Sequence, residues 1–341
     1  TLAITESNAR IIDPASGSSE PVAPKSIMIL FAAVVLGAVI PMGVLWLLNV
    51  TDTKVRTRRE LDDALSVPFL GDIPRHSTYK DENADAIVVH ENGRDSVSEA
   101  FRIIRTNMEF MRVKSENLQV VMFTSANPGA GKTFVSSNLA MSIAQTNKKV
   151  VLVDVDIRKG TLSGIFSNSS GRMGLTHYLS GRTDDLNDII GTSEEYGKLD
   201  IIFSGPVPPN PAELLLSERF DHLIAELRKQ YDYIIVDNVP AGMVADASIV
   251  NRVADLTIFV VRSGVMDRRQ LPELEKMYRE EQLRNMSVIL NGVSYERKGY
   301  GYGYGYGYGY GYGYGYGNDT HRHKRGKLES IKRTVFRFLK R

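Results

Sequence analysis

The sequence predicts an α/β domain with a mostly parallel sheet flanked by helices, preceded by one membrane-spanning helix and followed by a disordered tail. Three observations predict this organisation. Short apolar runs alternate with helix-compatible segments between Val120 and Leu290, which is typical of parallel strands joined by crossover helices. A long uncharged stretch precedes this region, and a strict Gly-Tyr repeat follows it.

Composition divides the 341 residues into six parts. They are an extracytoplasmic segment (1–25), a transmembrane helix (26–51), a juxtamembrane connector (52–86), a globular domain (87–298), a Gly-Tyr tail (299–317) and a basic tail (318–341). The formal net charge of +2 hides an asymmetry, because the basic tail holds nine Lys or Arg against two Asp or Glu. The rest of the chain is therefore acidic, and nothing indicates that the globular domain binds nucleic acid. The absence of cysteine excludes disulfides, thiol nucleophiles and thiolate metal sites.

The stretch Ser26–Thr51 carries no charged residue and is long enough to cross a hydrocarbon core of about 30 Å as a helix. Membrane helices tolerate a proline such as Pro41. Four basic residues, Lys54, Arg56, Arg58 and Arg59, follow the stretch closely, so the positive-inside rule places everything after it in the cytoplasm. A buried core helix is the alternative reading. The chain does not begin with Met, and we expect it to be a fragment of a longer protein.

After this stretch, the connector is expected to form a short charged helix over Arg56–Leu65 and then an irregular segment containing Pro68, Gly71 and Pro74. Ser96–Arg112 has a helical pattern, with Ser96 or Ser98 as a candidate N-cap. This segment places Glu99, Arg102 and Arg105 at three-residue spacing, which forms a charged ridge on a helix. Spacing alone favours a solvated, salt-bridged face.

Continuous apolar runs, as in strands buried on both faces, predict the elements of the globular domain. Strands are expected at Val120–Phe123, Val150–Val153, Asp200–Phe203, Tyr233–Val236, Leu256–Val261 and Val288–Leu290. Helices are expected at Phe134–Thr146, Leu175–Leu179, Pro211–Lys229, Asp246–Arg252 and Arg268–Glu281. A ligand is then expected at the carboxyl ends of the strands.

The segment Ala126–Thr133, ANPGAGKT, lies between the first predicted strand and the helix that follows it. It fits the phosphate-loop pattern G-x-x-x-x-G-K-[ST] at every fixed position except the first, where Ala replaces Gly. In such a P-loop, backbone N–H groups cradle phosphates, the lysine approaches the β- and γ-phosphates, and the hydroxyl binds Mg²⁺. The residues predicted to contact nucleotide are Pro128, Gly129, Ala130, Gly131, Lys132, Thr133 and Phe134. A loop that merely turns a strand into a helix is the alternative.

Two further predicted strands end in carboxylates, the first running into Asp154 and Asp156 and the second into Asp237. Acids at strand ends beside a phosphate loop are where Mg²⁺ has to be held. Asp237 matches a Walker B acid. Of Asp154 and Asp156, one is expected to touch the metal or its water and the other to approach an incoming hydroxyl. Each acid has an alternative role, capping a helix or pairing with Arg158.

The motifs ANPGAGKT, VLVDVDIRKG and YDYIIVDNVP resemble the Walker A, A′ and B set of bacterial tyrosine kinases of the capsule and exopolysaccharide machinery, in particular the one-chain members of the Wzc type. The segment PVPPNPAELLLSERF and the EAFRIIR ridge are also similar to that family. The resemblance identifies 87–298 as a P-loop tyrosine kinase domain that uses ATP and Mg²⁺. It also implies that the first membrane span and an extracytoplasmic domain precede Thr1. By contrast, Asn127 stands where partition ATPases have an extra lysine, so their nucleotide-sandwich dimer is not expected.

The resemblance further implies roles for individual residues. Asp154 helps to deprotonate or orient a tyrosine hydroxyl, while Asp156 and Asp237, with Thr133, hold Mg²⁺ directly or through water. Lys132 completes the catalytic set, and Asn291 lies near the adenine. Glu99, Arg102 and Arg105 sit at a subunit contact in a homo-oligomeric ring. The implied location is the bacterial inner membrane with a cytoplasmic catalytic domain, and the implied partners are a phosphotyrosine phosphatase and polysaccharide polymerase and export proteins.

The Gly-Tyr tail offers nine phenols as phosphate acceptors: Tyr300, Tyr302, Tyr304, Tyr306, Tyr308, Tyr310, Tyr312, Tyr314 and Tyr316. Alternating glycine makes such a strand weak, so we expect a disordered tail with exposed phenols. At full extension it could span about 60 Å, enough to reach a neighbouring subunit. The basic tail has an apolar helical stripe that suits an anionic membrane surface, or else it is a solvated end. Two alternatives to a kinase stay open. One is a nucleotide-dependent scaffold of a polysaccharide co-polymerase, and the other is a plain ATPase.

Overall fold

The computed structural model describes residues 17, 26–76, 87–91, 93–112, 118–164, 166, 173–192, 197–241 and 246–294. The extracytoplasmic segment, both tails with the nine tail tyrosines, and residues 77–86 of the connector lie outside the described residues, apart from Gly17. The chain divides into a unit of residues 1–295, treated below, and a second unit of residues 296–341.

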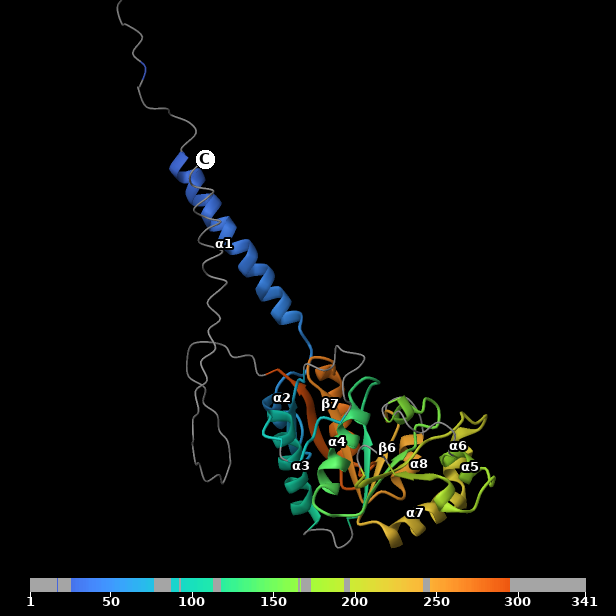
Figure 1. The fold of residues 1–341 in the computed structure, drawn as a ribbon. Coiled ribbons are helices and arrows are strands. Elements are labelled where there is room, and N and C mark those ends of the chain that lie inside the picture. Colours follow the sequence, from blue (N-terminus) through green and yellow to red (C-terminus); the bar gives the residue numbers. More distant parts are fainter. Residues whose placement is uncertain are drawn as a thin grey trace, which may run out of the picture. The chain divides into compact units, whose positions relative to one another are not determined.

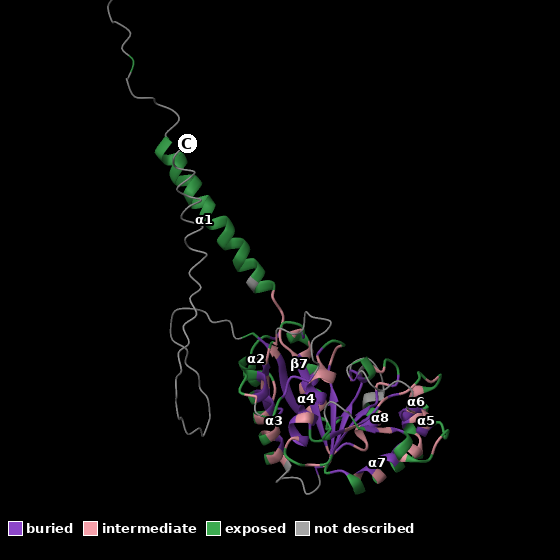
Figure 2. Ribbon diagram, in the orientation of Figure 1, coloured by how far each residue is buried: buried purple, intermediate pink, exposed green. Residues whose placement is uncertain are grey.

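The uncharged stretch forms helix α1 (Ser26–Thr51), with the bounds predicted from the sequence. Its part from Ser26 to Leu48 has a mean hydropathy of 2.6 and none of it is buried within the protein (Figure 2). Among the described residues, therefore, it is not a buried core helix. Length and composition suit a membrane span.

An eight-stranded sheet forms the centre of the domain (Figure 1). Its strand order is β1-β8-β7-β2-β6-β3-β5-β4, and every pairing is parallel except that of β4 with β5. The strands are β1 (Phe69–Pro74), β2 (Val120–Thr124), β3 (Val150–Asp154), β4 (Ile190–Thr192), β5 (Leu199–Ile202), β6 (Tyr233–Asp237), β7 (Leu256–Arg262) and β8 (Ser287–Val293). The predicted mostly parallel α/β sheet is therefore confirmed.

Helices cover both faces of this sheet. They are α2 (Arg58–Asp62), α3 (Ser96–Arg112), α4 (Lys132–Ala144), α5 (Leu175–Leu179), α6 (Pro211–Leu216), α7 (Glu218–Gln230), α8 (Asp246–Asn251) and α9 (Leu271–Arg279), with short 3₁₀ turns at Thr161–Gly164, Leu186–Asp188 and Arg268–Gln270. Alternate residues of β2 enter two different cores. Val121 and Phe123 pack with α3 and α4, whereas Val120 and Met122 pack with α5 to α9. Period-two alternation in a strand buried on both faces accounts for this division.

The connector differs from its prediction, because it is part of the domain rather than an irregular link. Residues 69–74, expected to be irregular, form edge strand β1 in parallel with β8. Val55 and Ile73 are fully buried. Close to the end of α1, the Thr53 hydroxyl donates to Asp267 (2.7 Å) and Val55 N–H donates to the carbonyl of Met266 (2.9 Å). The connector therefore packs against β8 and against the segment that follows β7.

Three helix predictions need smaller corrections. The helix expected over Pro211–Lys229 is broken at Ser217, whose extended backbone (ψ 150°) separates α6 from α7. The one expected over Arg268–Glu281 begins as a 3₁₀ turn before α9. Helix α3 is capped by Asp95, which accepts the N–H groups of Val97 and Ser98, rather than by Ser96 or Ser98.

Candidate functional site

The predicted P-loop joins β2 to α4, where Gly131 is the N-cap residue and Lys132 begins the helix. Gly129 (φ 74°) and Gly131 (φ 87°) both adopt the left-handed backbone conformation. A side chain at either position would strain the backbone, so the two glycines of the motif are needed for this turn. The turn brings the loop's N–H groups to the amino end of a helix, which favours negative charge. The geometry suits a phosphate cradle.

Lys132 lies inside this site, with its ammonium 3.5 Å from the Ser125 hydroxyl. Burial lowers the pKa of Lys132, and the attraction of Asp237 and Asp156 opposes that shift. A lysine beside two carboxylates and an anion cradle carries the point charge that a triphosphate requires.

Asp237 ends β6, next to β2, and is 1% exposed. Burial raises the pKa of Asp237 to about 6, although hydrogen bonds from Thr133 and Ser136 and the charge of Lys132 oppose the rise. Its Oδ1 atom is buried without a hydrogen-bond partner among the described residues. A buried carboxylate oxygen with no partner is costly unless a ligand binds it.

The donor set at this point fits a hard cation. Asp237 and Thr133 supply a carboxylate and a hydroxyl, and half-buried Asp156 lies near Lys132. No cluster of three or more His, Cys, Asp or Glu side chains in the described ranges forms a metal cage by itself. Mg²⁺ normally binds through one or two protein ligands, waters and the phosphates of its nucleotide, so a complete protein cage is not required.

Asp154 is the last residue of β3 and pairs in register with Asp237 on β6. It is fully buried, and its two oxygens accept the N–H groups of Asp156 (3.1 Å) and Leu162 (3.2 Å). Burial, and after it the charge of Asp237, raise the pKa of Asp154 well above its usual range. In this conformation Asp154 holds the turn over residues 155–162, and Asp156 is the more accessible acid. The role of Asp154 toward a tyrosine hydroxyl stays a prediction.

Side chains from β7, β8 and the segment between β7 and α9 support the P-loop from behind. Arg262 donates to the carbonyl of Gly129 (3.1 Å), and Asn291 donates to the carbonyl of Ala130 (2.9 Å). The Asn127 amide donates to Gln270 (3.1 Å). Asn291 is only 2% exposed, so it lies behind the loop. Its predicted place near the adenine stays a prediction.

The charged ridge of α3 makes internal contacts. Arg102 pairs with Glu99 (2.9 Å) and donates to the carbonyl of Gly93 (2.6 Å). Arg105 donates to the main chain and hydroxyl of Ser142 on α4. The ion pair between Glu99 and Arg102 agrees with the salt-bridged face that the spacing predicted. The role of the ridge in a ring stays a prediction.

Phe134, predicted to contact nucleotide, packs its ring edge-on against Phe101 of α3, with centroids 6.0 Å apart. Its side chain therefore belongs to the packing of α4 on α3. Sequence reasoning missed Ser136, Arg262 and Gln270, since none of them belongs to a phosphate-binding motif. In the sequence, only the position of Arg262 could have indicated its role. Arg262 follows an apolar run directly, as Asp154 and Asp237 do.

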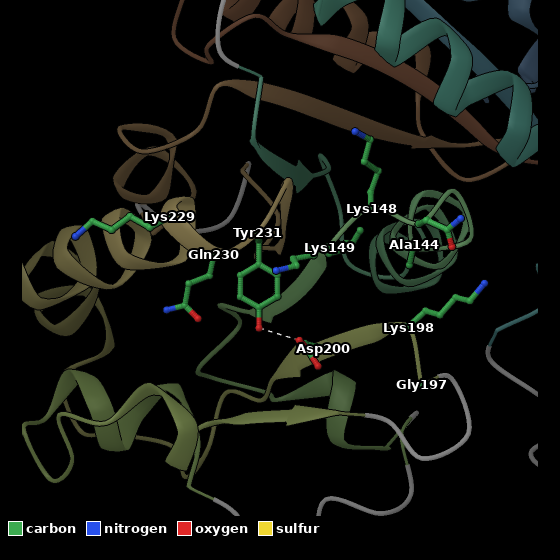
Figure 3. Close-up of a pocket in the computed structure, with 11 residues that line it drawn as sticks. Ala144, Lys148, Lys149, Gly197, Lys198, Asp200, Lys229, Gln230 and Tyr231 are labelled. Carbon is green, nitrogen blue, oxygen red and sulfur yellow. Dashed lines mark hydrogen bonds between the residues drawn. The ribbon is translucent and has the colours of Figure 1, made fainter.

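A cavity of about 670 Å³ lies at the opposite, amino-terminal edge of the strands (Figure 3). Lys148, Lys149 and Lys198 line it, and the Tyr231 hydroxyl donates to Asp200 across 2.8 Å. Helices α4 and α7 end here, so these lysines lie where cations offset the negative ends of helix dipoles. The cavity is separate from the P-loop and contributes nothing to the site.

Comparison with known proteins agrees with the geometry. An AAA domain family model matches residues 118–285, and the GNVR model, described as "G-rich domain on putative tyrosine kinase", matches residues 1–50. The solved kinase domain of the Escherichia coli tyrosine kinase Etk is 35% identical, with a TM-score of 0.64, and the match covers 74% of this chain and all of that one. The chain belongs to the bacterial tyrosine-kinase family.

Full-length relatives in this family extend beyond the present chain. Tyrosine-protein kinase Etk of Escherichia coli K12 is 33% identical over 304 residues, which cover 84% of this chain and 41% of Etk. Tyrosine-protein kinase Wzc of Salmonella typhimurium LT2 is 30% identical over 323 residues, covering 88% of this chain and 43% of Wzc. The chain thus spans about two fifths of the curated relatives it matches. Its P-loop belongs to a nucleotide-binding domain of this family.

Proposed function

We propose that this chain is an autophosphorylating protein-tyrosine kinase. It transfers the γ-phosphoryl group of ATP to tyrosines of the Gly-Tyr tail, in trans within a ring, and so regulates polymerisation and export of a surface polysaccharide. Helix α1 anchors it in the bacterial inner membrane with the catalytic domain in the cytoplasm. Kinship to Etk and Wzc supports the activity, and the arrangement of strand-end acids around the P-loop supports the chemistry.

One observation carries the proposal. The buried, unpartnered oxygen of Asp237 lies at the end of β6, beside the helix that begins with Lys132 and Thr133. We assign Asp237, Thr133 and Asp156 to Mg²⁺, which when bound would neutralise charge on the β- and γ-phosphates. The loop N–H groups and Lys132 hold the same phosphates. Ionisation of the buried Asp237 is costly without a counter-charge, and a bound cation would offset that cost.

The transfer itself needs a carboxylate that accepts the phenol proton. A tyrosine hydroxyl is barely ionised at neutral pH. Its oxygen forms a bond to Pγ while the bond from Pγ to the β–γ bridging oxygen breaks, so ADP leaves and the proton passes to a strand-end acid. We assign that acid to Asp154. Its two backbone hydrogen bonds imply that the turn over 155–162 moves when a tyrosine enters. Asp156 takes this role if the turn stays closed.

Phosphorylated tails would then control the ring. Each phosphate adds a charge of about −1.5 to −2, and nine acceptors would make the tails strongly anionic. Repulsion between tails weakens the ring, in which Glu99, Arg102 and Arg105 form the subunit contact. Replacing the nine tyrosines by Phe locks the assembled state. Phosphate-dependent dissociation that persists in that variant contradicts this part of the proposal.

The test is mass spectrometry of the purified full chain after incubation with ATP and Mg²⁺. We expect phosphotyrosine between Tyr300 and Tyr316 in the wild type and none in Lys132→Met. Asp154→Asn should abolish the transfer with Mg·ATP affinity unchanged, whereas Asp156→Asn, at a residue assigned to Mg²⁺, should weaken Mg·ATP binding as well. A loss of rate in Asp156→Asn at unchanged Mg·ATP affinity would assign the proton to Asp156 instead. Unmodified tyrosines with ATP-dependent ring formation favour the scaffold instead. Phosphate release to water that is independent of the tail favours a plain ATPase.

A further inference from the structure

We infer that Arg262 and Asn291 are positioning residues that aim two N–H groups of the P-loop at the phosphates. The inference rests on the proposed nucleotide site and goes beyond it, because neither residue is needed there as a direct ligand. Arg262 is the last residue of β7, Asn291 lies near the carboxyl end of the neighbouring strand β8, and the two are register partners in the sheet. Strand β7 is also the direct neighbour of β2, from which the P-loop begins.

The two side chains hold consecutive carbonyls of the loop, Arg262 that of Gly129 and Asn291 that of Ala130. In a planar trans peptide the C=O and the following N–H point in opposite directions. Drawing the Gly129 carbonyl toward β7 therefore turns the Ala130 N–H away from the sheet. In the same way, drawing the Ala130 carbonyl toward β8 turns the Gly131 N–H away from it. Neither N–H makes a hydrogen bond of good geometry to a protein acceptor among the described residues, although residues 127–130 form a turn.

Local sequence does not fix these directions by itself. Gly129 and Gly131 both have positive φ, and glycine loses the most conformational freedom when it is held in one state. A cradle that is already aimed before the anion arrives avoids that cost at binding. Asn291 suits the task because its backbone is held on both sides, pairing with Ile73 of β1 and with Arg262 of β7. Its burial keeps water from competing for the Ala130 carbonyl.

A third side chain also holds a carbonyl of the loop but orients no N–H group. The Ser125 hydroxyl donates to the carbonyl of Asn127 (2.8 Å), but the next residue is Pro128, which has no N–H to aim. That contact sets the position of the loop only. The aiming effect is thus confined to the two peptides held by Arg262 and Asn291.

The experiment measures the affinity of the full chain in detergent for ATP, ITP and inorganic tripolyphosphate. Tripolyphosphate has no base and reports on the cradle alone. Hydrogen bonds to charged groups contribute about 1.5–3 kcal/mol, so mis-aiming one N–H should weaken phosphate binding on the order of 10- to 100-fold. We expect Asn291→Leu to weaken ATP and tripolyphosphate by the same factor and to leave the ATP/ITP preference unchanged.

The matched control is Asn107→Leu, which removes an amide hydrogen bond of the same kind. That bond goes to the carbonyl of Leu70 (2.8 Å) on β1, which two strands separate from β2 in the sheet. It should lower the melting temperature without changing either affinity. Asn291→Leu that weakens ATP but not tripolyphosphate would show a contact with the base and overturn the inference. Unchanged affinities for both would overturn it as well.

Arg262 provides a second test if Asn291→Leu fails to fold. Arg262→Gln keeps an N–H donor, whereas Arg262→Met does not, and both lack the charge. We expect the Met variant to bind tripolyphosphate several-fold more weakly than the Gln variant, and equal binding contradicts the role of Arg262. Wild-type binding of ATP without phosphotyrosine formation refutes the proposed kinase activity and leaves this inference standing.

Discussion

Substituting Ile73 by Ala tests whether residues 69–74 belong to the catalytic domain. Ile73 lies in edge strand β1 and is fully buried. It joins the core that includes Phe101 and Ile104 of α3 and Ile289 of β8. The substitution leaves a cavity among these side chains because the surrounding backbone is fixed by the sheet. If the connector were an irregular link, as its prolines and glycine suggested, the same change would cost nothing.

Truncating a buried Ile to Ala typically costs about 2–5 kcal/mol. An edge strand relaxes more readily than a central one, so we expect the lower part of that range, about 2–3 kcal/mol. For a domain of this size each kcal/mol lowers the melting temperature by about 2–4 °C, which gives a shift of about 4–12 °C.

Calorimetry of the full chain in detergent measures this shift. The only tryptophan, Trp46, belongs to α1 and would not report on the domain. Val207→Ala is the control, since Val207 is 66% exposed and its truncation should change stability by less than about 0.5 kcal/mol. An Ile73→Ala melting temperature equal to that of the control would refute the assignment of β1 to the core.

Two further substitutions probe how the elements around the sheet are fastened. Hydrogen bonds from the Ser66 hydroxyl and N–H, and then from Arg279, lower the pKa of Glu275 from 4.5 to about 2. Because the pKa is lower in the folded state, ionised Glu275 stabilises the fold fully above pH 4.5, the pKa in the unfolded chain. This stabilisation is lost as the pH falls toward 2. Glu275→Gln should therefore melt a few degrees below wild type at pH 7, with a difference that shrinks between pH 4.5 and pH 3; a constant difference would contradict the linkage. Arg228 contacts both oxygens of Asp255 (2.7 Å each), and Arg228→Ala should cost about 2–3 kcal/mol by urea unfolding, against under about 0.5 kcal/mol for Lys229→Ala. Equal losses in those two variants would show that the half-buried pair of Arg228 and Asp255 contributes no more than an exposed ion pair.

The parts of the fold that the sequence predicted are those in which local pattern and tertiary structure agree. The central strands are continuous apolar runs, and each of the three motifs follows one of them. Local chemistry requires Gly129, Gly131, Lys132 and Thr133 in fixed order, so a short window of sequence contains the whole signal. The same holds for α1, where an uncharged run alone determines a long apolar helix.

Strand β1 was missed because its sequence contains residues that disfavour strands. Gly71 and Pro74 argue against a strand in the interior of a sheet. At the edge they are tolerated, and Gly71 is required, since a Cβ there would lie 2.7 Å from Cγ1 of Ile104. Pro68 precedes the strand and offers its carbonyl to the N–H of Val288 (2.9 Å). Close packing against α3 thus outweighs the low strand propensity of these residues, and that tertiary contact cannot be deduced from the local sequence.

The division between what was predicted and what was not also runs through the P-loop. Its motif supplies the left-handed turns and the cation, and these depend on residues adjacent in sequence. The direction of its N–H groups depends on Arg262 and Asn291, which are 133 and 161 residues from the carbonyls they hold. Because the first motif position is Ala126 rather than Gly, the loop contains only two glycines, and both carry positive φ. In this loop the local sequence determines the turns, and side chains of the sheet determine the direction of the N–H groups. Variants near the ends of β7 and β8 should therefore change phosphate binding while every motif residue stays intact.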